Sequence, residues 1–163
     1  MDLSTYSQNH IDVKITDGYE KTWRLTGFYG HPNRRKMCHS WTLLRRLAGL
    51  TRLPWVCIGD FNKILCDNDK CGGVDRNWKS MSEIREALDD CGLEDMGFIG
   101  LSFTWSNKRE GNSMIMERID RSFYNREYMG MFPYFSARHL DFWSSDHRPS
   151  VLEFSIGAHV IFF

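Results

Sequence analysis

A short apolar run that ends abruptly in polar residues most constrains the fold of this 163-residue chain. Residues 55–58 read WVCI, the pattern of a strand that is covered on both faces. Gly59 permits a sharp bend or a close approach, and Asp60 and Asn62 follow at the carboxyl end of the strand. Open α/β sheets place their chemistry at that end. Asp60 is explained equally well as a cap or turn residue and as part of a site.

Length and composition indicate one globular domain with a substantial core. Hydrophobic residues make up 42% of the chain and aromatic residues 14%, which argues against disorder. The 21 basic and 21 acidic residues cancel, so no net charge draws the chain to nucleic acid or to membranes. Between Lys21 and Gly59, however, basic residues occur without any acidic one, and one face is expected to be positive. A solvated helix face and a nucleic-acid-binding patch both explain such a segment, and the former is the commoner.

The cysteines and the N-terminal residues indicate the cellular compartment in which the protein is expected. Five cysteines, at positions 38, 57, 66, 71 and 91, cannot all pair with one another, which favours reduced intracellular thiols. A zinc site built on Cys66 and Cys71 lacks a CxxC pair and a histidine at metal spacing. The first ten residues do not read as a signal peptide, and no apolar run approaches membrane-spanning length. We expect an intracellular protein, cytoplasmic or nuclear, without a membrane or an obligate protein partner.

Hydrophobic spacing and turn residues predict α/β layers around a mixed sheet, with no internal domain boundary. Two alternating runs flank the turn at Asp17 and Gly18 and predict an antiparallel hairpin. Ser80 with Glu83 matches a capping box that opens a helix, and Gly92 ends it. The predicted strands are 10–16, 22–29, 54–59, 102–106, 114–124, 134–140 and 150–156, and the predicted helices are 34–50, 80–91 and a short turn from 125 to 129.

Four polar clusters stand at predicted strand ends or turns and together suit the cleavage of a phosphate ester. A hard cation such as Mg2+ prefers carboxylate oxygens, which Asp146 can supply. Asp120 can pair with His147 and fix the tautomer of the imidazole, whose N–H can then stabilise a developing oxyanion. Asp60 can orient or deprotonate the attacking water. The clusters are Tyr29, Asp60 with Asn62, Asp120, and Asp146 with His147.

Each cluster also has a purely structural explanation. Asp146 fits an Asx turn equally well. Asp120 lies within a strand pattern, where a surface salt bridge to Arg118 or Arg121 accounts for it. Tyr29 alone is most simply an aromatic residue at a strand end. The functional interpretation therefore depends on the four clusters together.

The order of these motifs resembles that of a known enzyme superfamily. GDFN at 59–62, FTWSN at 103–107, RIDRSF at 118–123 and SSDHRP at 144–149 resemble the endonuclease/exonuclease/phosphatase superfamily. With WRLTGFYGHPNRR at 23–35, the chain is most similar to the AP-endonuclease-like domain of LINE-type non-LTR retrotransposons, from about residue 10 to residue 154. The resemblance implies an α/β (α+β sandwich) fold, with two packed mixed β-sheets flanked by helices. It also implies a DNA endonuclease-like phosphodiester hydrolase that uses Mg2+ or Mn2+.

The resemblance assigns roles to individual residues. Asp60 corresponds to the aspartate that activates water, and Asn62 to the asparagine that orients the phosphate. Asp120 corresponds to the residue that supports the catalytic histidine, His147. Tyr29 corresponds to the tyrosine near the scissile phosphate. The remaining assignments are Asp146 as a metal-associated aspartate, Trp105 and Asn107 on a hairpin that approaches DNA (a core tryptophan is an equal alternative), and Arg34, Arg35 and Lys36 as nucleic-acid contacts.

The chain also departs from the pattern of that family. The family domain begins with a strand that carries an active-site asparagine, followed by a glutamate that is the principal metal ligand, and neither has a counterpart here. We therefore expect residues 1–156 to be the C-terminal portion of such a domain and 157–163 an unstructured or read-through tail. A weak metal site and weak or absent activity are expected, because divalent affinity follows the number of carboxylate ligands. A non-catalytic retrotransposon remnant that at most binds nucleic acid, and a phosphatase of the same superfamily, are the alternatives.

Overall fold

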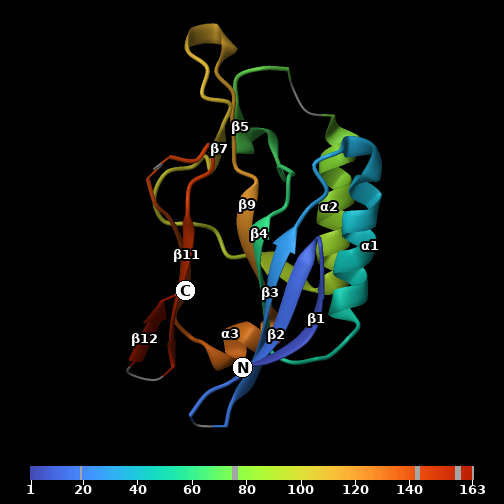
Figure 1. Cartoon of the computed structure of the whole chain (residues 1–163), viewed down its shortest axis with the longest axis vertical. Helices are drawn as coiled ribbons and strands as arrows, with labels where there is room; N and C mark the ends of the chain where they lie inside the picture. The colour runs from blue at the N-terminus through green and yellow to red at the C-terminus, as the bar shows by residue number, and fades with distance from the viewer. Residues whose placement is uncertain (19, 75–76, 142–143, 157–158, 163) are drawn as a thin grey trace.

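Six strands form the larger sheet of the protein in the order β1-β2-β3-β4-β9-β6. A computed structural model describes residues 1–18, 20–74, 77–141, 144–156 and 159–162 (Figure 1). Within this sheet β3 and β4 run parallel, and the other neighbours are antiparallel. The bounds are β1 (Asp2–Ser7), β2 (His10–Thr16), β3 (Thr22–Tyr29), β4 (Trp55–Asp60), β6 (Leu93–Asp95) and β9 (Asp120–Asn125).

The apolar run of β4 lies in the middle of the sheet and is buried on both sides, as its sequence predicts. Val56 and Cys57 are both completely buried, and they belong to different core clusters on opposite faces. Because parallel strands cannot be joined by a tight turn, the chain crosses from β3 to β4 through the 3₁₀ turn η1 (Arg34–Lys36) and helix α1 (Met37–Ala48). The carboxyl ends of β3 and β4 therefore lie side by side.

Helices α1 and α2 (Trp78–Cys91) cover one face of the larger sheet, on the right in Figure 1. Trp41 and Leu44 of α1 and Ile84 of α2 pack with Phe123 of β9 in this core. Both helices are confirmed, but the predicted capping box is wrong: α2 begins earlier, with the Asn77 side chain accepting a hydrogen bond from the backbone of Lys79. The hydroxyl of Ser80 instead accepts a hydrogen bond from Lys63.

A second layer covers the opposite face. It contains helix α3 (Arg126–Met131), which Asn125 caps as predicted, and an antiparallel sheet in the order β10-β11-β12. Trp23 of the larger sheet makes edge-to-face contacts with Tyr128, Phe132 and Phe154 between the layers. Strands β10 (Phe135–His139) and β11 (Ser150–Ile156) confirm two predicted strands, and the layered α/β sandwich is thereby the observed fold class.

The structure contains a strand near each end of the chain that the sequence did not predict. Strand β1 was not expected: it lies at the sheet edge with nearly every residue exposed, so its sequence carries no alternation between buried and exposed positions. The stretch predicted to be an unstructured or read-through tail contains strand β12 (His159–Phe162), which pairs with β11. Residues 157, 158 and 163 of that stretch lie outside the described residues.

The two strands predicted at 102–106 and 114–124 differ from those observed. The first is reduced to β7 (Trp105–Ser106), and the second is divided into β8 (Met116–Glu117) and β9. Strands β7 and β8 join β5 (Lys70–Cys71) in a small third sheet. Between β8 and β9 the backbone N–H of Arg118 donates to the carbonyl of Asp69, and that of Ile119 donates to the hydroxyl of Thr104. These contacts to neighbouring loops replace a continuous ladder. In the described part of the chain, no helix is both long and apolar enough to cross a membrane.

Candidate active site

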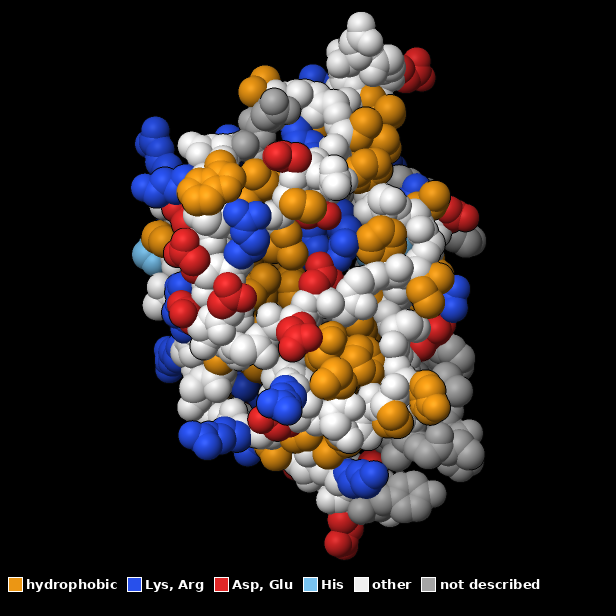
Figure 2. Space-filling view, turned by 180° about the vertical axis from the view of Figure 1, so that it is seen from behind, with side chains coloured by type: hydrophobic (Ala, Val, Ile, Leu, Met, Phe, Trp, Pro, Cys, Tyr) orange, Lys and Arg blue, Asp and Glu red, His pale blue; other side chains and the backbone are white. Residues whose placement is uncertain are grey.

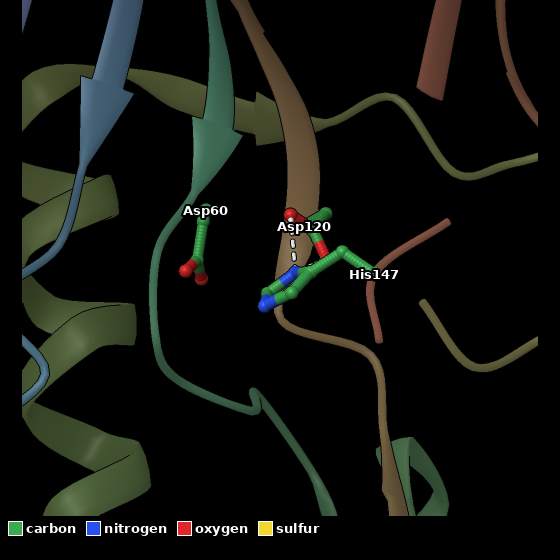
Figure 3. A group of neighbouring side chains, drawn as sticks. All are labelled: Asp60, Asp120 and His147. Atoms are coloured by element: carbon green, nitrogen blue, oxygen red, sulfur yellow. Dashed lines mark hydrogen bonds and ion pairs between the residues drawn. The ribbon is translucent and has the colours of Figure 1, made fainter. Parts of the chain in front are cut away.

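Asp60 and Asp120 lie opposite each other on two neighbouring central strands. Asp60 is the last residue of β4 and Asp120 the first of β9, and the two are direct partners in the antiparallel register (Figure 3). Gly59 has a φ of 150°, and a Cβ atom there would lie 2.0 Å from the carbonyl oxygen of Phe28. The glycine therefore lets β3 and β4 approach closely just before Asp60, as its sequence context predicts.

His147 reaches the same place from the loop before β11. Its Nδ1 lies 3.0 and 3.2 Å from the two carboxylate oxygens of Asp120. This hydrogen bond raises the pKa of His147 above its ordinary value, although partial burial opposes the effect. The contact fixes the ring with Nδ1 toward Asp120, and Figure 3 shows the second ring nitrogen on the side of Asp60. The predicted pairing of Asp120 with His147 is thus present in the structure.

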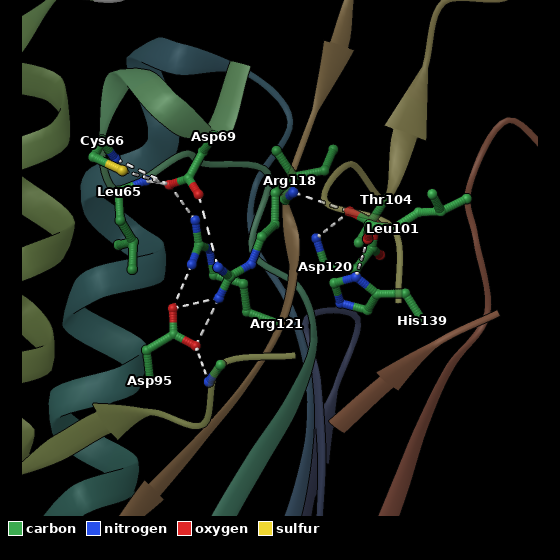
Figure 4. A network of polar contacts seen from close by, with 12 residues as sticks. Leu65, Cys66, Asp69, Asp95, Leu101, Thr104, Arg118, Asp120, Arg121 and His139 are labelled. Carbon is green, nitrogen blue, oxygen red and sulfur yellow. Dashed lines mark hydrogen bonds and ion pairs between the residues drawn. The ribbon is translucent and has the colours of Figure 1, made fainter. Parts of the chain in front are cut away.

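The alternative explanation of Asp120, a surface salt bridge to a neighbouring arginine, is not what the structure shows. Arg121 donates to Asp95 over 2.5 Å and also to Asp69, and Arg118 donates to Asp95 over 2.6 Å (Figure 4). Arg121 is almost completely buried, and Asp69 additionally accepts hydrogen bonds from the backbone of Leu65 and Cys66. The two arginines are therefore occupied by a separate ion-pair network that ties the segment after Asp60 to β9.

Asn62 holds the Asp60 carboxylate. Its backbone N–H donates to one oxygen over 2.7 Å, and its side-chain amide donates to the other over 2.9 Å. The same amide nitrogen donates to the carbonyl of Gly30 over 2.8 Å. Asn62 adopts a φ of 52°, in the left-handed region that non-glycine residues occupy mainly at turns and functional sites. The Asn62 amide therefore holds Asp60 in place, and the role in orienting the phosphate stays a prediction.

Burial raises the pKa of Asp60 to about 6, and the neighbouring Asp120 charge adds to the effect. The hydrogen bonds from Asn62 and the proximity of His147 act in the opposite direction. A carboxyl with this pKa exchanges a proton readily near neutral pH, which suits a general base. Two carboxylates held this close also repel each other, and a cation between them would relieve that repulsion.

Asp60, Asp120 and His147 can together hold a metal ion. One ligand atom from each lies within 4.8 Å of the others, and all three residues are partly buried. The donor set of two carboxylates and one imidazole fits a divalent cation. Asp146, the predicted metal-associated residue, is not part of this group: its Oδ2 accepts a hydrogen bond from the indole Nε1 of Trp105 over 3.0 Å. That hydrogen bond lowers the pKa of the exposed Asp146 carboxyl.

The other predicted site residues lie on strands and turns next to this centre. Tyr29 is the register partner of Asp60 on β3 and is exposed. Trp105 pairs with His147 through an isolated β-bridge and is half-buried. The side chain of Asn107 closes its own hairpin, with contacts to the backbone of Arg109, Ser113 and Ile115.

A pocket of about 220 Å³ opens beside the centre. Asn62, Trp105 and His147 line it together with Arg34, Lys63 and Glu117. Lys63 and Glu117 were not singled out in the sequence, although Lys63 directly follows the GDFN motif. Arg34, Arg35 and Lys36 are all exposed on η1, and of the three Arg34 lines this pocket near the candidate centre. On the face shown in Figure 2, basic side chains are interspersed with acidic ones, so positive charge is not concentrated there.

No protein-family model and no curated protein sequence matches the chain. Solved structures do match. The endonuclease domain of TRAS1, a telomere-specific non-LTR retrotransposon, superposes with a TM-score of 0.68 at 19% identity, over 96% of this chain and 69% of that one. An endonuclease/exonuclease/phosphatase family protein from Leptotrichia buccalis superposes with a TM-score of 0.56 at 14% identity, over 90% and 53%. The chain has the endonuclease/exonuclease/phosphatase fold.

Another structure with this fold is the 3'-5' exonuclease from Neisseria meningitidis, which superposes with a TM-score of 0.64 at 20% identity. The alignment covers 90% of this chain and 64% of the exonuclease. The chain thus spans about two thirds or less of the length of most of these structures. The fold expected from the order of the sequence motifs is confirmed.

Proposed function

We propose that the chain is a metal-dependent phosphodiester hydrolase of the endonuclease type, with DNA as its substrate. The observation that carries this proposal is the arrangement of Asp60 opposite the Asp120–His147 pair at the ends of two central strands. The same fold occurs in a retrotransposon endonuclease domain and in a 3' phosphatase bound to a DNA hairpin, which favours a nucleic-acid substrate.

The residues divide the chemistry between them. Asp60, held by Asn62 on both of its oxygens, accepts the proton of the attacking water. His147, kept in one orientation by Asp120, presents its second ring nitrogen to the phosphate and stabilises the developing negative charge. A divalent cation would be held by the carboxylates of Asp60 and Asp120 beside the His147 ring, with Mg2+ and Mn2+ as the candidates, and would neutralise charge on the phosphate. Arg34 and the neighbouring basic residues of η1 contact the DNA backbone.

A nicking assay on supercoiled plasmid tests the proposal. We expect weak nicking with Mg2+ or Mn2+, because the chain offers few carboxylate ligands for the cation, none with a chelator, and loss of nicking in Asp60→Ala. Asp89→Ala, a substitution at an exposed position on α2, is the matched control and should nick as the wild type does.

Two other outcomes would contradict the proposal and favour a different function. Salt-dependent DNA binding without nicking would indicate a non-catalytic nucleic-acid-binding remnant. Removal of a terminal or small-molecule phosphate without strand cleavage would indicate a phosphatase.

A further inference from the structure

One buried threonine, Thr104, contacts the backbone of both segments that carry the Asp120–His147 pair. It directly precedes β7 and is completely buried. Its hydroxyl oxygen accepts hydrogen bonds from the backbone N–H groups of Ile119 and Asp120, over 3.1 and 3.0 Å (Figure 4). Its carbonyl oxygen accepts a hydrogen bond of 2.7 Å from the backbone N–H of Arg148.

The loop that carries His147 depends on the same short segment. The backbone N–H of Ser106 donates to the carbonyl of Asp146 over 3.0 Å, so the contacts of Thr104 and Ser106 bracket His147 on either side. Ser144, Ser145 and Asp146, which precede His147, are exposed, and the backbone N–H of His147 donates to the hydroxyl of Ser145 over 3.1 Å. The residues on either side of His147, Asp146 and Arg148, are held by backbone hydrogen bonds to Ser106 and Thr104.

We propose that Thr104 is a positioning residue of the candidate active site, which sets the distance between the Asp120 carboxylate and the His147 ring. Its hydroxyl fixes the start of β9 and its carbonyl fixes the loop before β11, so one residue joins two segments that are far apart in the sequence. The effect of Thr104 on turnover rests on the proposed function. Its effect on the Asp120–His147 contact does not depend on catalysis.

Two substitutions isolate the hydroxyl. Thr104→Val keeps the shape of the side chain but removes the acceptor of two buried N–H groups, whereas Thr104→Ser keeps the acceptor. Thr26→Val is the matched control: Thr26 is also completely buried and hydrogen-bonded, to Asp12 and Trp55, but lies away from the site. Thr104→Ala, compared with Thr104→Ser, replaces the valine variant if that variant does not fold.

The first readout is spectroscopic. In Thr104→Val we expect the amide signals of Ile119 and Asp120 to shift and the Nδ1–H signal of His147 to broaden through exchange with water. Thr104→Ser and Thr26→Val should keep the His147 signal. The proposal is overturned if Thr104→Val keeps that signal, or if Thr26→Val loses it to the same degree, because the effect would then be general destabilisation.

The second readout is the rate of plasmid nicking. Misplacement of the pair should lower kcat of Thr104→Val about tenfold to a hundredfold and leave KM for DNA within about twofold, with Thr104→Ser close to the wild type. An unchanged kcat beside a lost His147 signal would overturn the link to catalysis. If the wild type does not nick, the proposed function fails, and the spectroscopic comparison still decides whether Thr104 positions the pair.

Discussion

Replacing Asp60 by asparagine should favour the folded state increasingly as the pH rises. Burial and the charge of Asp120 raise the pKa of Asp60 from its ordinary value of 3.8 to about 6 in the folded state. The folded state therefore keeps the proton longer than the unfolded state does, and stability falls as the pH rises from about 4 to above 6. Asparagine carries no charge at any pH and is free of this cost.

The size of the effect follows from the two pKa values. The difference between about 6 and 3.8 corresponds to at most about 3 kcal/mol, at about 1.4 kcal/mol per pKa unit. Asp60 is only half-buried, and screening by solvent reduces the expected figure to about 1–2 kcal/mol. Asparagine also loses one of the two hydrogen bonds from Asn62, because its amide nitrogen cannot accept one, but this loss is the same at every pH and does not change how the difference grows with pH.

Urea denaturation, followed by tryptophan fluorescence in the presence of a chelator, measures the effect. The stability difference between Asp60→Asn and the wild type should grow by about 1–2 kcal/mol between about pH 4.5 and about pH 8. Asp89→Asn, at an exposed position, should show no such growth. A difference that is constant with pH, or that shrinks as the pH rises, would refute the reasoning that Asp60 is held in an unfavourable charged state.

Two further substitutions test the contacts around this residue. Asp120→Asn should lower the pKa of His147 toward its ordinary value, because the carboxylate that raises it is removed; an unchanged NMR titration of the ring would contradict the pairing. Arg121→Met should lower the free energy of unfolding by about 3 kcal/mol, since it leaves buried carboxylates without a partner, whereas the exposed Arg45→Met should cost less than about 1 kcal/mol. Equal losses in a urea titration of the two arginine variants would show that the buried network contributes no more than a surface pair.

The parts of the fold that the sequence predicted are those whose burial leaves a pattern. The run at 55–58 is apolar because both faces of β4 are covered, and the stripes of α1 and α2 face the same core. Edge strand β1 has no buried face and so no pattern. The sequence prediction placed the start of α2 too late, because both Asn77 and Ser80 can cap the helix. Only the tertiary contact of Ser80 with Lys63 decides between them.

The candidate site was predictable as a set of residue types and only partly as a geometry. The order of the motifs indicated Asp60, Asp120 and His147, and these residues do lie together. Nothing local to Asp120 shows that the adjacent arginines are taken by Asp69 and Asp95, because those partners are distant in the sequence. The role of Thr104 could not be predicted either, because its contacts are with two segments that are distant in the sequence.

The most direct test of the central claim is to locate a bound Mn2+ ion by the broadening that it causes in NMR spectra. If Asp60, Asp120 and His147 form one metal-dependent centre, substoichiometric Mn2+ should broaden the signals of these residues and of Asn62 first. Asp60→Asn should weaken this effect, and Asp146→Asn should change it less. Broadening that begins elsewhere, or that is the same in Asp60→Asn as in the wild type, would contradict the account.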